Sequence, residues 1–397
     1  MKALLLENIH PGADRVFKDA GFEVEAVPQS PAKKVLTRMM EDVAVLGIRS
    51  KTRIGPDILQ RAPHLSAIGA FCIGTEQIDL SACDERGIAV FHAPYSNTRS
   101  VVEMALGEMI MLLRGVFDAS GRLHQGVWAK SAAGFHEIRG KRLGIIGYGN
   151  IGSQLSILAE SLGMEVGYYD LEEKLPLGNT RKYPFKDLLR RSDVVTVHVD
   201  GRDANKNLIG EKEFAAMKEG VVFLNLSRGF VVDMEALARH IRNGRIRGAA
   251  VDVFPEEPAS NRAPFSSSLQ GMPNVILTPH IGGSTEEAQA GIGAFVAERI
   301  AAYFATGSTL TSVNFPVYQP LGRAYLHRFA HIHENIPGML ARINEVFARR
   351  GINIAGQHLQ TRGTVGYAII DVDGPCNKGV LADLEAIPNT IRVRLVY

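Results

Sequence analysis

His280, Glu257 and Arg228 lie apart in the sequence, but their side chains are the ones that the oxidation of a hydroxy acid requires. An imidazole, with an ordinary pKa near neutrality, can take up the hydroxyl proton in one direction and return it in the other. The carboxylate of Glu257 would fix the tautomer of that imidazole, and the planar guanidinium of Arg228 would hold a substrate carboxylate. Taken singly, each residue also fits a plainer interpretation, as a loop histidine, a turn acid or a surface charge.

A glycine motif predicts a dinucleotide site. A G-x-G-x-x-G spacing follows a predicted strand at Leu143–Ile146 and consists of Gly147, Gly149 and Gly152. These glycines permit a tight turn, and the free N–H groups of the next helix would bind a pyrophosphate. A second predicted strand ends in Asp170, whose carboxylate suits the ribose hydroxyls and favours NAD over NADP. The alternative is that three turn glycines lie in an ordinary βα unit.

The elements that must position these residues are strands alternating with helices. Six strands are predicted in the middle of the chain, the number in a complete dinucleotide-binding sheet: Leu143–Ile146, Glu165–Tyr169, Val194–Val199, Val221–Leu226, Ile246–Val253 and Val275–Thr278. Each of the last three of these strands is closely followed by a polar residue that could do chemistry. These residues are Arg228, Glu257 and His280, in that order. Ligands of such sheets bind at the carboxyl ends of strands, so we expect the three side chains to converge there.

The first 95 residues predict a second open parallel sheet. Its strands are Ala3–Leu6, Glu23–Val27, Val43–Ile48, Leu65–Ala70 and Ala89–Phe91. Arg49 and Lys51 follow the third of these strands, and two cations at a strand end would suit an anionic substrate. A pair of solvated loop charges is the simpler alternative.

The last stretch, Arg323 to Tyr397, predicts a separate small α+β unit. Its strands near Leu326–His333, Ile352–Gln360, Tyr367–Val372 and Ile391–Val396 and its helices Gly338–Arg350 and Asn377–Ile387 follow the order βαββαβ. This order is ferredoxin-like. Because no catalytic grouping is evident in it, we expect a regulatory or assembly module.

Composition limits the remaining classes. A chain of 397 residues is expected to form two or three domains, and its net charge of +2, without a basic block, favours neither a nucleic-acid nor a membrane partner. Cys72, Cys83 and Cys376 are few and widely spaced, which argues against a disulfide framework or a metal site. The N-terminus predicts a strand and not a signal peptide, and no apolar segment reaches transmembrane length. We therefore expect a cytoplasmic protein without a bound metal.

Over nearly its whole length the sequence resembles the NAD-dependent D-2-hydroxyacid dehydrogenases. The segments that carry the resemblance are GIRSKT (47–52), FCIGTEQIDL (71–80), APYSNTRSVVE (93–103), GYGNIGSQL (147–155), LSRGFVVD (226–233), AAVDVFPEEP (249–258), LTPHIGGSTEEAQ (277–289), STLTSVNFP (308–316) and HIHENIPG (331–338). The resemblance implies an α/β fold in which a Rossmann-type, doubly wound parallel sheet domain (97–282) is inserted in a discontinuous flavodoxin-like substrate-binding domain (1–96 and 283–322). A ferredoxin-like ACT domain (323–397) follows.

The resemblance also implies the roles of individual residues. The family's catalytic set falls on Arg228, Glu257 and His280. Its NAD contacts fall on Gly147, Gly149, Asn150, Ile151, Gly152, Asp170, Leu226, Ser227, Arg228, Asp252, His280, Gly282 and Gly283. Its contacts to the substrate's phosphate and carboxylate fall on Arg49, Ser50, Lys51, Gly74 and Asn97.

The activity that the resemblance implies is the oxidation of 3-phospho-D-glycerate by NAD in the first step of serine synthesis, by a homotetramer. L-Serine would act as a feedback inhibitor bound across a domain dimer by His333, Asn335 and Asn353, although these residues also fit loop caps at a subunit interface. Two positions depart from the pattern: a single Gly322 stands where relatives have a Gly-Gly pair, and Lys51 stands where some have arginine. The alternatives are a dehydrogenase of 2-hydroxyglutarate, glyoxylate, hydroxypyruvate or D-lactate, and an NAD-sensing scaffold.

Overall fold

The computed structural model describes residues 1–258, 263–320, 326–374 and 378–397. Gly322, Cys376 and Asn377 therefore lie outside the described residues. The chain divides into two compact units, which we name the central unit (Asn97–Ala288) and the terminal unit (Met1–Ser96 with Gln289–Tyr397). The two units are described separately below.

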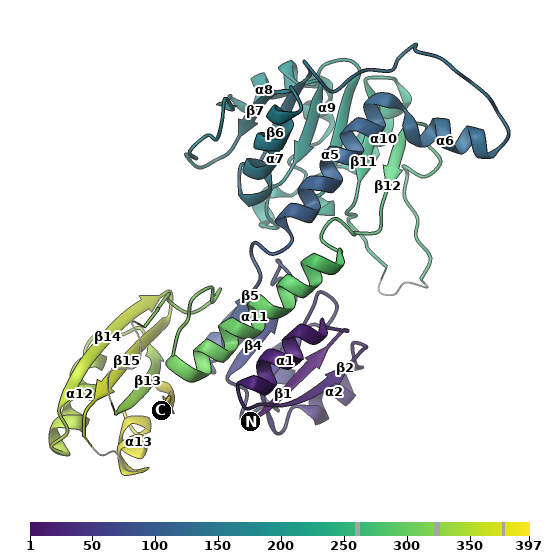
Figure 1. The fold of residues 1–397 in the computed structure, drawn as a ribbon. Coiled ribbons are helices and arrows are strands. Elements are labelled where there is room, and N and C mark those ends of the chain that lie inside the picture. The colour runs from purple at the N-terminus through teal and green to yellow at the C-terminus, as the bar shows by residue number, and fades with distance from the viewer. Residues whose placement is uncertain (259–262, 321–325, 375–377) are drawn as a thin grey trace. The chain divides into compact units, whose positions relative to one another are not determined.

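The central unit contains a seven-stranded, entirely parallel sheet with the order β12-β11-β10-β9-β6-β7-β8 (Figure 1). Its strands are β6 (Arg142–Ile146), β7 (Glu165–Tyr169), β8 (Arg181–Lys182), β9 (Val194–Val197), β10 (Val221–Asn225), β11 (Ile246–Val251) and β12 (Val275–Leu277). The order reverses between β6 and β9, as in a dinucleotide-binding fold, and ligands of such sheets bind beyond the carboxyl ends of these strands.

Helices cover both faces of this sheet because successive strand residues point to opposite faces. On β10, Val222 and Leu224 pack with α5 (Thr98–Arg114) and α7 (Asn150–Ser161). Val221 and Phe223 point the other way. They pack with the other layer of helices, α8 (Phe185–Arg191), α9 (Glu211–Ala216) and α10 (Met234–Arg242). A further helix, α6 (Val116–His124), follows α5 and buries none of its residues.

The terminal unit contains a five-stranded parallel sheet with the order β2-β1-β3-β4-β5. Its strands are β1 (Lys2–Leu6), β2 (Glu23–Val27), β3 (Val43–Ile48), β4 (Ala67–Ala70) and β5 (Ala89–His92). This order is the flavodoxin-like one, so the predicted fold class of this part is confirmed. One face packs against α1 (Pro11–Asp19) and α11 (Glu286–Thr306), and the other against α2 (Lys33–Met39), α3 (Pro56–Leu59) and α4 (Leu80–Asp84).

The C-terminal part of the terminal unit is an antiparallel sheet with the order β14-β15-β13-β16. The elements are β13 (His327–Glu334), α12 (Met339–Arg349), β14 (Ile354–Arg362), β15 (Val365–Val372), α13 (Lys378–Glu385) and β16 (Thr390–Leu395). They follow the predicted βαββαβ order. Both helices pack on one face of this sheet, against residues that include Phe329 and Ile370.

The opposite face of the antiparallel sheet joins the core of the flavodoxin-like part. Ile332 and Tyr367 belong to the same buried cluster as Phe91 and Tyr303. Tyr367 Oη donates a hydrogen bond to the carbonyl oxygen of Gly307 at 2.8 Å. These contacts place the C-terminal sheet in one compact unit with residues 1–96. Among the described residues, none of the helices is both long and apolar enough to cross a membrane.

Candidate active site

The glycine turn lies between β6 and α7, at a carboxyl end of the central sheet. Gly147 has a φ of +92°, and a Cβ at this position would lie 2.5 Å from the carbonyl oxygen of His198. A Cβ at Gly152 would lie 2.3 Å from the carbonyl oxygen of Gly147, so α7 can approach the turn only with glycine there. A Cβ at Gly149 would meet nothing within 4 Å. The turn is therefore open at the N-terminus of α7, where the N–H groups of Asn150 and Ile151 could bind a pyrophosphate.

Asp170 follows β7 and is fixed beside the glycine turn. Its Oδ2 accepts a hydrogen bond from the backbone N–H of Tyr148 at 2.7 Å, and its Oδ1 accepts one from the N–H of Glu172 at 2.9 Å. Each carboxylate oxygen has a second lone pair that can accept from a ribose hydroxyl. The open turn and this carboxylate fit the phosphate and ribose groups of NAD.

His280 and Glu257 form a hydrogen-bonded pair. Nδ1 of His280 lies 2.9 Å from Oε2 of Glu257, while the imidazole side chain stays 48% exposed. The hydrogen bond to Glu257 raises the pKa of His280 above its ordinary value, against the opposing effect of burial. Burial would raise the pKa of Glu257, but its interactions with His280, the N–H of Phe254 and Arg228 together hold this pKa below the ordinary value. The pair thus favours a protonated imidazole beside an ionised carboxylate.

Asp252 fixes the turn that carries His280. The backbone of His280 is left-handed, with a φ of +54°, and its N–H donates to the carbonyl oxygen of Asp252 at 2.8 Å. Oδ1 of the buried Asp252 side chain accepts from the Thr278 hydroxyl at 2.6 Å and from the Ile281 N–H at 2.8 Å, and Oδ2 accepts from the Gly282 N–H at 2.8 Å. This carboxylate therefore holds the Thr278 side chain before His280 and the backbone directly after it. The sequence assigned Asp252 only to NAD and gave no signal for this bonding.

Arg228 is brought towards Glu257 by a close approach of two loops. A Cβ on the next residue, Gly229, would lie 1.9 Å from the carbonyl carbon of Phe254, so only glycine allows the loops after β10 and β11 to meet. Asn225 holds the turn, because its side chain accepts from the N–H and hydroxyl of Ser227 and donates to the carbonyl oxygen of Arg228. The charge of Arg228 acts on both Glu257 and His280. The structure therefore brings the three predicted residues together within the central unit.

A buried acid that the sequence analysis did not single out lies near this group. Glu108 of α5 is 2% exposed, and neither of its carboxyl oxygens has a hydrogen-bond partner among the described residues. Burial, with a further contribution from the charge of Asp252, raises the pKa of Glu108 to about 8. At neutral pH the Glu108 carboxyl is therefore largely protonated.

The residues predicted to bind the substrate are divided between the two units. Asn97 belongs to the central unit. Its side chain lies close to Gly283, since a Cβ at Gly283 would be 2.2 Å from Nδ2 of Asn97. Arg49, Ser50, Lys51 and Gly74 belong to the terminal unit. Two residues missed from the sequence hold these loops: Glu7 accepts from backbone N–H groups of Lys51 and Thr52, and Gln77 donates to the carbonyl oxygens of Arg49 and Gly74.

The predicted effector residues are divided between the two ends of the antiparallel sheet. His333 and Asn335 lie at the end of β13, where His333 pairs with Gly366, whereas Asn353 precedes Ile354, which pairs with Val372 at the other end. His333 is buried, with Nδ1 2.8 Å from the carbonyl oxygen of Glu334, and within the described ranges its Nε2 has no partner. Asn335 and Asn353 are exposed, and Asn335 Nδ2 donates to the carbonyl oxygen of Gly363 at 3.0 Å.

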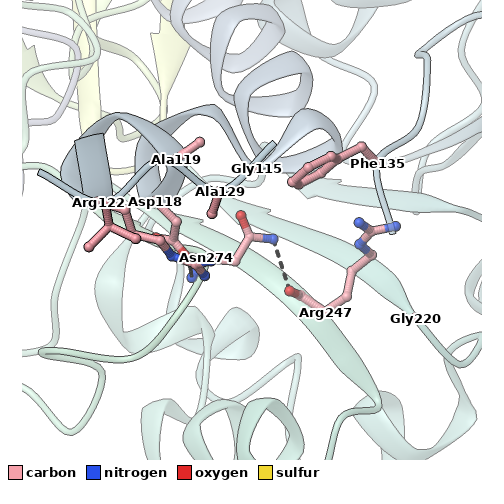
Figure 2. A pocket seen from close by; sticks show the side chains of 10 residues that line it. Gly115, Asp118, Ala119, Arg122, Ala129, Phe135, Gly220, Arg247 and Asn274 are labelled. Atoms are coloured by element: carbon pink, nitrogen blue, oxygen red, sulfur yellow. Dashed lines mark hydrogen bonds between the residues drawn. The ribbon is translucent and has the colours of Figure 1, made fainter. Parts of the chain in front are cut away.

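A cavity of about 440 Å³ lies at the other end of the central sheet from the glycine turn. Its lining includes Gly220 just before β10, Arg247 near the start of β11 and Asn274 just before β12. Figure 2 shows Asn274 Nδ2 donating to the carbonyl oxygen of Arg247, at 2.9 Å. The predicted NAD and catalytic residues do not line this cavity.

Comparison with known proteins agrees with this arrangement. The family model described as D-isomer specific 2-hydroxyacid dehydrogenase, NAD binding domain, matches residues 106–282, and the model of an AHAS small subunit-like ACT domain matches residues 329–392. D-3-Phosphoglycerate dehydrogenase of Escherichia coli strain K12 is 50% identical over 404 residues, covering 100% of this chain and 98% of that protein. The enzyme of the same name from Haemophilus influenzae is 47% identical over 399 residues, covering 100% and 97%.

Among solved structures, D-lactate dehydrogenase from Aquifex aeolicus complexed with NAD and lactic acid has a TM-score of 0.70 and 25% identity, over 79% of this chain and 99% of that one. The fold and the site thus define an NAD-dependent oxidoreductase of the D-2-hydroxyacid dehydrogenase class. Within that class, the chain belongs to the D-3-phosphoglycerate dehydrogenase family. The predicted class, cofactor and ACT domain are confirmed.

Proposed function

We propose that the protein oxidises 3-phospho-D-glycerate to 3-phosphohydroxypyruvate with NAD, the first step of L-serine biosynthesis. The observation that carries this proposal is the hydrogen bond of 2.9 Å between His280 and Glu257, beside Arg228 and on the sheet that holds the glycine turn. The names of the full-length relatives support 3-phosphoglycerate as the substrate.

The roles of the three residues follow from this geometry. Nδ1 of His280 is engaged by Glu257, so Nε2 is the atom that takes up the proton of the substrate hydroxyl. The carboxylate of Glu257 stabilises the imidazolium that forms, and the guanidinium of Arg228 binds the substrate carboxylate. The chemistry that NAD supplies when bound is the acceptance of the hydride that leaves the hydroxyl-bearing carbon.

Cofactor binding is assigned to three groups of residues. Gly147, Gly149, Asn150, Ile151 and Gly152 take the pyrophosphate. Asp170 takes the ribose. The remaining contacts are assigned to Leu226, Ser227, Arg228, Asp252, His280, Gly282 and Gly283.

The substrate's phosphate and carboxylate are further assigned to Arg49, Ser50, Lys51, Gly74 and Asn97. Among the described residues, neither Arg49 nor Lys51 pairs with a carboxylate, which supports a role in binding an anion. The domain boundaries drawn from the sequence, with the NAD domain at 97–282, belong to this proposal.

Regulation by L-serine is the second part of the proposal. The match to an ACT domain supports binding of a small polar ligand by His333, Asn335 and Asn353 across a domain dimer, and so does Nε2 of His333, which has no partner among the described residues. We also propose a homotetramer in the cytoplasm.

A serine titration tests substrate and regulator together. NADH formation from 3-phospho-D-glycerate is followed by absorbance while L-serine is added, with D-serine as the control. We expect 3-phospho-D-glycerate to be oxidised faster than D-lactate or 2-hydroxyglutarate, and L-serine alone to lower the rate. Faster oxidation of another hydroxy acid would refute the substrate, and equal effects of the two serine enantiomers would refute the effector site.

A further inference from the structure

The turn after β3 carries two cationic side chains in the terminal unit. Arg49 is half-buried and Lys51 is exposed. Among the described residues, neither cationic group has an ion-pair or hydrogen-bond partner, so the shape of this turn depends on other contacts.

Glu7 makes two of these contacts. It lies directly after β1 and is only 8% exposed. Its Oε2 accepts a hydrogen bond from the N–H of Lys51 at 3.0 Å, and its Oε1 accepts one from the N–H of Thr52 at 2.7 Å. Both oxygens of one buried carboxylate therefore hold two successive residues of the turn.

The backbone that presents this carboxylate is unusual. Glu7 has a φ of +65° and Asn8 a φ of +55°, and residues other than glycine seldom adopt this left-handed conformation. Strained backbone persists where surrounding contacts determine it, and it gathers at functional sites. Here the strain lies at the residue that fixes the turn of Arg49 and Lys51.

Other polar contacts hold the same turn. Gln77 Nε2 donates to the carbonyl oxygen of Arg49 at 2.6 Å, and it lies 3.4 Å from that of Gly74. The hydroxyl groups of Thr52 and Ser30 are 2.7 Å apart. The backbone is thus held on both sides of Ser50, while the cationic groups of Arg49 and Lys51 are left to bind a ligand.

We propose that Glu7 is the positioning residue of the substrate's anion-binding turn. Its carboxylate accepts hydrogen bonds from the N–H groups of Lys51 and Thr52 and so fixes the backbone of the turn. From this backbone, Arg49 and Lys51 present their charges to the substrate's phosphate or carboxylate. This inference rests on the proposed function, because it takes the assignment of Arg49 and Lys51 to the substrate as given.

The variant Glu7→Gln tests the proposal with little change in shape. The glutamine amide has only one acceptor oxygen. Its NH₂ group would face a backbone N–H that donates to the Glu7 carboxylate in the wild-type protein. One backbone donor therefore loses its acceptor. We expect the KM for 3-phospho-D-glycerate to rise about tenfold, the effect of losing one charge-assisted hydrogen bond, while the KM for NAD is unchanged.

The matched control is Glu25→Gln. Glu25 is an exposed acid on β2 that pairs with Lys2 at 3.0 Å, and its substitution should leave both KM values unchanged. Thermal unfolding is measured for each variant. A loss of thermal stability without a change in the KM for the hydroxy acid, or an equal rise in both KM values, would overturn the proposal.

A double-mutant cycle with Lys51→Met separates positioning from a general effect on folding. If Glu7 acts through the cations of the turn, the rise in KM for the double variant is smaller than the product of the two single effects. A rise equal to that product would contradict the proposal. If the wild-type protein prefers another hydroxy acid, the proposed function fails, and the same cycle on the preferred acid still tests the role of Glu7.

Discussion

Replacing His280 with alanine is expected to lower kcat for 3-phospho-D-glycerate oxidation by about 10²- to 10⁴-fold, the usual contribution of a general acid–base group. The variant loses the imidazole that takes up the hydroxyl proton, whereas the glycine turn and Asp170 are unchanged. NADH binding should therefore persist, because every assigned NAD contact other than His280 is retained. Steady-state rates and a fluorescence titration with NADH measure the two properties separately.

The matched control for this variant is His136→Ala. His136 is an exposed histidine of the same unit, and in the part of the chain that the structure describes its hydrogen bond is that of its backbone N–H to the carbonyl oxygen of Leu113 at 2.9 Å. Its substitution should leave kcat unchanged. Retained activity in His280→Ala would remove the role assigned to His280, and a parallel loss of NADH binding would show that the variant disturbs the fold of the site.

The variant Glu257→Gln is expected to reduce the rate and to displace its pH dependence. Oxidation requires neutral His280, so kcat/KM rises with pH through the pKa of this residue. The hydrogen bond to Glu257 raises that pKa in the wild-type protein, and a neutral amide cannot stabilise the imidazolium. The acidic limb of the oxidation profile should therefore move to lower pH, and the basic limb of the reduction profile should move in the same direction.

Profiles of kcat/KM against pH in both directions measure this displacement. Glu256→Gln is the control, because Glu256 is the exposed neighbouring acid and Glu257 is the one that bonds to His280. A Glu257→Gln profile that coincides with the wild-type profile would show that Glu257 does not set the protonation of His280.

Both parallel sheets could be predicted from the sequence because most of their strands are short apolar runs separated by helical segments. The strand β8 was missed, since Arg181 and Lys182 are two exposed charged residues and give neither an apolar run nor an alternation. The contribution of Ile332 and Tyr367 to the core of the flavodoxin-like part was also missed. An apolar residue on a strand indicates a buried face but does not identify the layer that covers it.

The three catalytic candidates could be predicted because the carboxyl ends of parallel strands lie along one edge of a sheet. The residues that hold the site could not be predicted in this way. Asp252 and Glu7 act through hydrogen bonds to the backbone of loops that are distant in the sequence, and such bonds leave no local pattern. Glu108 lies in an apolar helix, where its burial follows from packing and not from its residue type.

Isotope transfer is the most direct test of the claim that these residues direct a hydride from a hydroxy acid to NAD. The wild-type protein is incubated with NAD and 3-phospho-D-glycerate that carries deuterium on the hydroxyl-bearing carbon, and the NADH is analysed by mass spectrometry. We expect every molecule of NADH to contain one deuterium atom from the substrate. NADH without deuterium, or no NADH at all, would show that this hydride transfer does not take place.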